Sequence, residues 1–180
     1  MVTPGTRAPS HHPAHPRALV VLPVLLCLLA LAACHREFGT APHGGPGSGS
    51  RGPALVNAIR SAAHPGFDRL VFDLQEFGGN GIPDYNVRYV PASSLRQDLP
   101  TGGSRLVTVQ GAYFLTLDLG ESSTTFGPFE LTPNLREIKQ VKVVGDLHGL
   151  VYGVGLARRN GFRVFALRNP SRIVLDVQNN

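Results

Sequence analysis

The sequence Leu-Ala-Ala-Cys at residues 31–34 is the segment whose residue types predict a defined chemistry. It closes an uninterrupted apolar run, and a thiol is the side chain that can form a stable thioether to a diacylglyceryl group. Small residues followed by cysteine at the end of such a run are typical of a lipoprotein signal peptide. We therefore predict export, cleavage before Cys34 and lipidation of its thiol. The alternative is an ordinary signal peptide whose cut falls near a cysteine.

The residues before Cys34 favour a cleaved leader over a permanent membrane span. The apolar run covers only residues 18–33 and contains Pro23, whereas a helix that crosses a bilayer needs about 20 apolar residues. Arg7 and Arg17 precede the run without any acidic residue, as in the positive region of a secretory leader. We expect a signal peptide over residues 1–33 and a protein held by lipid on the extracytoplasmic face of the cell membrane.

Cleavage would also decide the redox chemistry and the charge of the chain. Cys27 would leave with the leader, so Cys34 could form no internal disulfide and no cysteine metal cluster is expected. The chain has 17 Lys+Arg and 12 Asp+Glu, and the loss of Arg7 and Arg17 leaves a charge of +3. The basic residues are scattered, unlike those of a nucleic-acid-binding surface. We expect no nucleic-acid partner, no metal and no cofactor.

The remaining polar residues do not match the spacing of an enzyme site. The sequence contains no Gly-x-Ser-x-Gly or His-Glu-x-x-His motif. Asp118 and Glu121 flank Gly120 and could form a carboxylate pair at a strand end, although a solvated turn is the expected arrangement. The sequence therefore predicts no catalytic residue, and we expect that the chain is not an enzyme.

Aromatic side chains supply candidate binding residues. Tyr85, Tyr89, Phe114 and Phe126 could stack on sugar rings or contact a peptide. Tyr85 and Tyr89 share a strand face, which equally suits a core with hydroxyl groups at its edge. Phe114 is expected on the face opposite its neighbours. For each residue the alternative is packing in the core or at its edge.

Composition divides the exported part into two regions. Residues 34–53 are rich in Gly, Pro and Ser and nearly devoid of large apolar groups, which predicts a flexible tether. His35 and His43 lie in it and are expected to be solvated. Residues 54–180 form one domain, long enough to bury a core.

Short alternating segments broken by Gly, Pro and Asn predict that this domain is all-β. Strands are expected over residues 67–75, 85–91, 105–119, 138–147, 150–159, 162–168 and 172–177. Gly111 divides the third strand, whose apolar residues from Val107 to Leu117 are expected on one side. Asn160-Gly161 predicts a hairpin that joins the fifth and sixth. Val56 and Ile59 fit either a strand or a helical turn.

Two of these segments repeat each other. Residues 68–74, DRLVFDL, match residues 171–177, SRIVLDV, in class at nearly every position. The alternation places the apolar triplet inward and the Arg and Asp on the opposite face. Arg69 and Arg172 could pair with an acid across neighbouring strands or meet solvent, and both join the candidate binding residues.

Residues 169–177, NPSRIVLDV, resemble the closing strand of AMIN domains, which reads Pro-x-Arg-[LIV]-Val-[LIV]-Asp-[LIV]. Residues 64–73, HPGFDRLVFD, are similar to the opening of the AMIN-like domain of actinobacterial lipoproteins, and residues 150–156 and 162–164 also fit that group. The resemblance implies a small antiparallel β-sandwich of two sheets. It also implies non-catalytic attachment to the cell envelope, often through peptidoglycan. AMIN domains usually accompany an amidase or secretin module, which this sequence does not show.

The sequence thus predicts an envelope lipoprotein whose β-sandwich binds or scaffolds an envelope component. The expected partners are the membrane, through lipid on Cys34, and either peptidoglycan or another envelope protein. One alternative is an envelope enzyme or small-ligand carrier with its site between the sheets. Another is an accessory subunit that adds a strand or a sheet face to an envelope protein.

Overall fold

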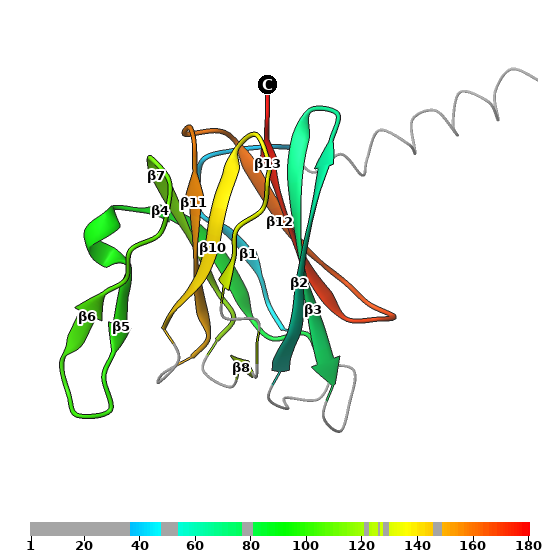
Figure 1. Cartoon of the computed structure of the whole chain (residues 1–180). Helices are drawn as coiled ribbons and strands as arrows, with labels where there is room; N and C mark the ends of the chain where they lie inside the picture. Colours follow the sequence, from blue (N-terminus) through cyan, green and yellow to red (C-terminus); the bar gives the residue numbers. More distant parts are fainter. Residues whose placement is uncertain are drawn as a thin grey trace, which may run out of the picture. The chain divides into compact units, whose positions relative to one another are not determined.

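The computed structural model describes residues 37–47, 54–76, 81–120, 123–125, 127, 130–145 and 149–180. Cys34, Glu121, Phe126, Leu147 and the signal peptide lie outside these residues, so what was expected of them stays a prediction. The described chain consists mainly of strands, with a short 3₁₀ helix at Ala92–Ser94 (Figure 1). This confirms the all-β fold predicted from the sequence.

The domain is a sandwich of two sheets. The first has six strands in the order β1 (His43–Gly45), β4 (Tyr85–Val90), β7 (Tyr113–Asp118), β11 (Val151–Leu156), β10 (Ile138–Gly145) and β9 (Glu130–Leu131). The second has five, in the order β12 (Phe162–Leu167), β13 (Arg172–Gln178), β3 (Phe67–Glu76), β2 (Ala54–His64) and β8 (Thr124–Thr125). The pairing of β2 with β8 is parallel, and the other pairs within the two sheets are antiparallel.

The inner faces of the two sheets meet in an apolar core. Leu70 and Phe72 on β3 and Leu175 on β13 are fully buried, as the alternation of these segments predicts. The ring of Phe72 lies 5.0 Å from the ring of Tyr152 on β11, measured between centroids, and so joins the two sheets. Burial of these apolar faces contributes about 25 cal/mol of stabilising free energy per Å² removed from water. It is the main force that holds the two sheets together.

Val56 and Ile59, for which the sequence left open a strand or a helical turn, lie in strand β2. Both side chains are buried although they are three residues apart, a spacing that a regular strand would place on opposite faces. A shift of register between Val56 and Ala58 adds one residue and returns Ile59 to the inner face. The helix-like spacing in the sequence is therefore the signature of a β-bulge.

The prediction of a hairpin at Asn160-Gly161 is wrong. Strand β11 pairs with β7 and β10 in the six-stranded sheet, whereas β12 pairs with β13 in the five-stranded sheet. The link between them crosses from one sheet to the other. The side-chain amide of Asn160 donates to the carbonyl of Gln178 at 2.8 Å, which fixes this crossing to the end of β13. Contacts distant in sequence therefore override the local turn signal.

The structure also differs from expectation over residues 37–47, part of the segment predicted to be a flexible tether. Gly39 exchanges two backbone hydrogen bonds with Phe162 on β12, at 3.0 and 2.8 Å. Strand β1 then pairs with β4 of the other sheet. Phe38 lies 4.5 Å beneath the guanidinium of Arg163. This part of the chain is therefore bonded to both sheets.

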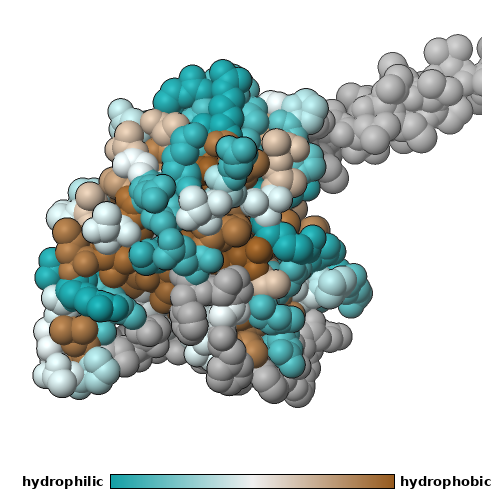
Figure 2. All heavy atoms as spheres, viewed as in Figure 1, coloured by the Kyte–Doolittle hydropathy of each residue, from teal (hydrophilic) through white to brown (hydrophobic). Residues whose placement is uncertain are grey.

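Between β4 and β7 the chain forms a ribbon, defined here as residues 91–112, which includes β5 (Arg96–Asp98) and β6 (Ser104–Leu106). Gly111 separates β6 from β7, as predicted. Val109 does not share a face with Leu117, however, because it packs with Leu95 and Val144 in a second apolar cluster. In Figure 2, apolar residues gather over β10 and the ribbon. The ribbon thus covers part of the outer face of the six-stranded sheet.

Gly155 on β11 allows this covering. A Cβ atom at Gly155 would lie 1.8 Å from the carbonyl oxygen of Gln110 in the ribbon. Gly153, two residues earlier on the same face, faces Val144 and Leu95 of the second cluster. The two glycines therefore permit close backbone packing, the role that their type and spacing favour in a strand.

Candidate functional site

An aromatic groove lies where β4 and β7 meet the start and the end of the ribbon. We call it the rim groove; its volume is about 530 Å³. Its lining residues are Tyr89, Val90, Pro91, Ala92, Ala112, Tyr113, Phe114 and Arg159. Two of the aromatic candidates from the sequence, Tyr89 and Phe114, are therefore brought together here.

Tyr89 is fixed within the rim groove. Its hydroxyl donates to the carbonyl of Asn160 at 2.6 Å, and the guanidinium of Arg159 lies 4.6 Å from its ring centroid. Burial raises the pKa of Tyr89 above its usual value, and this is partly offset by the hydrogen bond with Asn160. The phenol therefore stays neutral at physiological pH. Its ring forms one side of the rim groove.

Tyr113 is the more accessible aromatic residue of the rim groove. Its exposed fraction is 44%, whereas Tyr89 and Phe114 are half-buried. It begins β7, where the inward-facing row of side chains runs out at the end of the sheet. The ring of Tyr113 and the donors of Arg159 are therefore available to a ligand.

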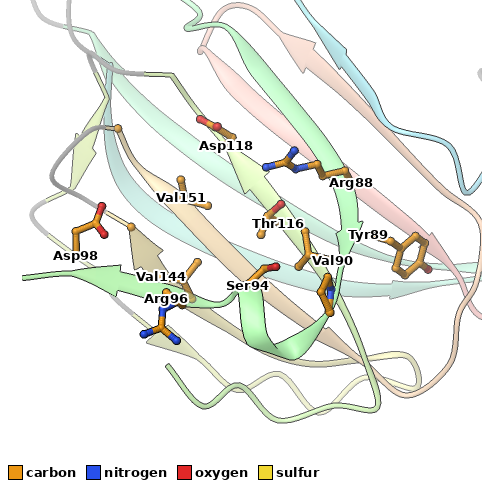
Figure 3. Close-up of a pocket in the computed structure, with 13 residues that line it drawn as sticks. Arg88, Tyr89, Val90, Ser94, Arg96, Asp98, Thr116, Asp118, Val144 and Val151 are labelled. Carbon is orange, nitrogen blue, oxygen red and sulfur yellow. The ribbon is translucent and has the colours of Figure 1, made fainter. Parts of the chain in front are cut away.

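A second groove adjoins the first on the outer face of the six-stranded sheet. We call it the charged groove; its volume is about 550 Å³ (Figure 3). Its polar lining consists of Arg88, Ser94, Arg96, Asp98, Thr116 and Asp118. Tyr89, Val90 and Pro91 line both grooves, so the two adjoin each other at the end of β4.

Tyr85 lies apart from the rim groove, at the start of β4. It is half-buried and packs against the main core. It also borders a small surface hollow with Asp84, Asn86 and Asp118. A Cβ atom at Gly45 of β1 would lie 2.6 Å from its hydroxyl oxygen, so β1 covers this tyrosine closely.

Arg69 and Arg172 lie on the five-stranded sheet. Arg69 donates to both carboxylate oxygens of Asp176, at 2.6 and 2.8 Å, and this hydrogen bonding raises its pKa. The cross-strand pairing considered from the sequence is therefore present for Arg69. Arg172 instead donates to the carbonyl of Pro170 at 3.3 Å, while Asp73, its register partner, binds Arg60.

Sequence reasoning missed Tyr113, Arg159, Arg88 and Asp118 as possible binding residues. Tyr113 was assigned to an inward row, and its exposure comes from its place at the strand end. A usable signal existed for Arg88 and Asp118. They alternate with the buried Val87 and Leu117, so they had to face away from the core.

The described residues contain no group of three or more His, Cys, Asp or Glu placed to hold a metal ion. None of their helices is long and apolar enough to span a membrane.

Comparison with known proteins identifies the family. The model of the AMIN-like domain matches residues 54–179. Searches of curated proteins and of solved structures each returned no match. AMIN-like domains target or bind the cell envelope and are not catalytic modules, which implies an envelope location for this chain. Because the match extends over most of the sequence, this chain belongs to the AMIN-like domain family.

Proposed function

We propose that this chain is a lipoprotein whose AMIN-like domain binds peptidoglycan without catalysing a reaction. It is exported, clipped before Cys34 and held by lipid on that thiol at the extracytoplasmic face of the cell membrane. The family match supports the envelope role. The observation that carries the wall-binding part is the rim groove.

The rim groove has the chemistry that a glycan requires. Sugar rings present flat C–H faces that stack on aromatic rings, and their hydroxyl groups accept hydrogen bonds from cationic donors. Tyr113 supplies an aromatic ring that is 44% exposed. Arg159 supplies guanidinium donors beside Tyr89. The mild positive charge that remains after cleavage before Cys34, +3, also favours an anionic wall polymer.

Co-sedimentation with purified cell-wall sacculi tests this proposal. The full-length protein in detergent solution should pellet saturably, and pelleting should survive about 0.3 M salt, where scattered surface charges are screened. Tyr113→Ala should weaken pelleting about fivefold, because stacking on one aromatic ring contributes roughly 1 kcal/mol. Leu167→Ala, also an exposed apolar residue (38%) but on β12, is the matched control and should pellet like wild type. Pelleting that salt abolishes would refute specific wall binding.

The anchor has its own test at Cys34. Cys34→Ala should abolish the incorporation of labelled fatty acid and should release the protein from the membrane fraction. Ser48→Ala, in the same predicted tether, controls for general effects of substitution. Equal membrane association of wild type and Cys34→Ala would exclude the thiol as the anchor.

A second candidate function, the addition of a strand from another envelope protein, is supported by the edge of β2. This strand pairs with β8 only at Leu55 and Val56, so residues 57–64 have no outer partner among the described residues. Such an edge is a template for another chain. Loss of sacculus binding with retention of a stable protein partner would favour this function. The grooves described above offer no comparable support for a site between the sheets.

A further inference from the structure

The charged groove carries one charge of each sign on each of its two walls. Arg88 on β4 and Asp118 on β7 form the sheet wall, where they lie diagonally across paired strands. Arg96 and Asp98 on β5 form the ribbon wall. Figure 3 shows these two pairs on opposite sides of Thr116 and Ser94. The lining thus has no net charge but is strongly polar.

Two of these four side chains are available to a ligand. Arg96 is held in the ribbon by Ser104, to whose hydroxyl it donates at 2.8 Å, and Asp118 accepts from the backbone N–H of Gly120 at 2.9 Å. Arg88 and Asp98 are exposed, and neither forms a side-chain hydrogen bond or ion pair within the described residues. The groove therefore offers one unpaired cation and one unpaired carboxylate from opposite walls.

The position of this groove relates it to the rim groove. Tyr89, Val90 and Pro91 border both grooves, so a ligand with its sugar in the rim groove has the charged groove beside it. An uncharged sugar would leave both side chains unused. A peptide with a free ammonium group and a free carboxylate would pair with both.

We propose that the charged groove binds the peptide portion of a peptide-bearing glycan, with Arg88 on its carboxylate and Asp98 on its ammonium group. This inference rests on the proposed wall binding and extends it from the glycan to the attached peptide. The two grooves together then select glycan strands that still carry their peptides.

Isothermal titration calorimetry on the full-length protein in detergent solution tests the inference. The two probes are the wall disaccharide with its tetrapeptide and the same disaccharide after removal of the peptide. Wild type should bind the peptide-bearing probe about tenfold more tightly. Arg88→Gln and Asp98→Asn should each reduce this preference to about threefold or less and leave the affinity for the bare disaccharide unchanged. Arg168→Gln, an exposed arginine outside both grooves, should keep the full preference.

The outcomes separate this inference from the function on which it rests. Equal affinity of wild type for the two probes, together with salt-resistant sacculus binding, would overturn the inference and leave wall binding standing. A preference that persists in Arg88→Gln and Asp98→Asn would also overturn it, because another surface would then hold the peptide. Absence of binding to either probe refutes the inference, and the sacculus experiment then decides the proposed function by itself.

Discussion

Two fully buried aspartates, Asp68 and Asp176, lie in the repeated strand segments, at different positions of the repeat. Asp68 is fully buried on β3 and accepts hydrogen bonds from the backbone N–H groups of Glu137 and Ile138, at 2.6 and 3.2 Å, which ties β3 to the start of β10. Asp176 is also fully buried, although it lies on the outer face of its sheet. Arg69 and Arg163 bind it, and aromatic rings that include Phe67 cover the two guanidinium groups. Both aspartates are therefore structural.

Replacement of Asp176 by Asn should destabilise the fold substantially. The change leaves Arg69 and Arg163 without their counter-charge in a partly desolvated site. We expect a loss of about 3 kcal/mol in the free energy of unfolding, the lower end for a broken buried ion pair, because both arginines keep some contact with water.

Chemical denaturation of Asp176→Asn and of Arg60→Gln measures this contrast. Arg60 binds Asp73 on the same sheet face at 2.6 Å, but its side chain is 57% exposed. Loss of that surface pair should change the free energy of unfolding by less than about 1 kcal/mol. Similar losses in the two variants would contradict the structural role of Asp176.

At the scale of elements, the glycines of β11 determine where the ribbon lies. The carbonyl of Gln110 occupies the space that a side chain at residue 155 would need. The backbone N–H of Gln110 is fixed as well, because it donates to the side-chain oxygen of Gln140 on β10 at 2.7 Å. Both grooves depend on this placement, because each takes one wall from the ribbon.

Gly155→Ala should therefore displace the ribbon. The new methyl group would collide with backbone that cannot rotate away, and we expect a loss of about 2 kcal/mol. Hydrogen exchange should increase across residues 104–112. Gly39→Ala is the matched control, since its Cβ would meet no atom within 4 Å. Unchanged exchange in Gly155→Ala would show that the ribbon is not held at this glycine.

The elements were more predictable than their partners. Alternation located β3, β4, β10 and β13, because burial of one face imposes a period of two on the sequence. It did not locate β1, since Gly44 and Gly45 bear no side chain that could show a period. The Asn160-Gly161 signal was read as a hairpin because a turn motif is local, whereas the choice of sheet depends on the whole core. The rim groove was half predictable: Tyr89 and Phe114 were named, but their meeting with Arg159 requires the crossing at Asn160.

At the scale of the whole molecule, Tyr152 reports on the packing of the two sheets. It is fully buried, and its hydroxyl forms no hydrogen bond of full geometry within the described residues, although Thr125 lies near it. Burial raises the pKa of Tyr152 to about 12 from an ordinary value of 10.0. In the folded domain this hydroxyl is therefore shielded from water.

The stability of the domain should consequently fall in strong alkali. Below pH 10 Tyr152 is neutral in both states, and its contribution is complete. Between pH 10 and pH 12 the unfolded chain loses this proton while the folded domain keeps it, so the free energy of unfolding decreases by about 1.4 kcal/mol per pH unit.

Denaturation of wild type and Tyr152→Phe across this pH range isolates the effect, because all other ionisable groups are common to the two proteins. The phenylalanine variant should lose less stability as the pH rises. Parallel pH profiles for the two proteins would show that Tyr152 ionises while the domain remains folded.

Residues 37–47 are bonded to both sheets, and this limits how far the domain could move from an anchor at Cys34. A flexible tether from Cys34 to residue 53 would have a contour length of roughly 70 Å at 3.5 Å per residue. Attachment at Gly39 reduces this contour to about 18 Å. A domain anchored by lipid on Cys34, as proposed, would be confined to a thin layer above the membrane, with a high effective concentration for targets inside that layer and almost none beyond it. The glycan within its reach would then be the innermost part of the wall.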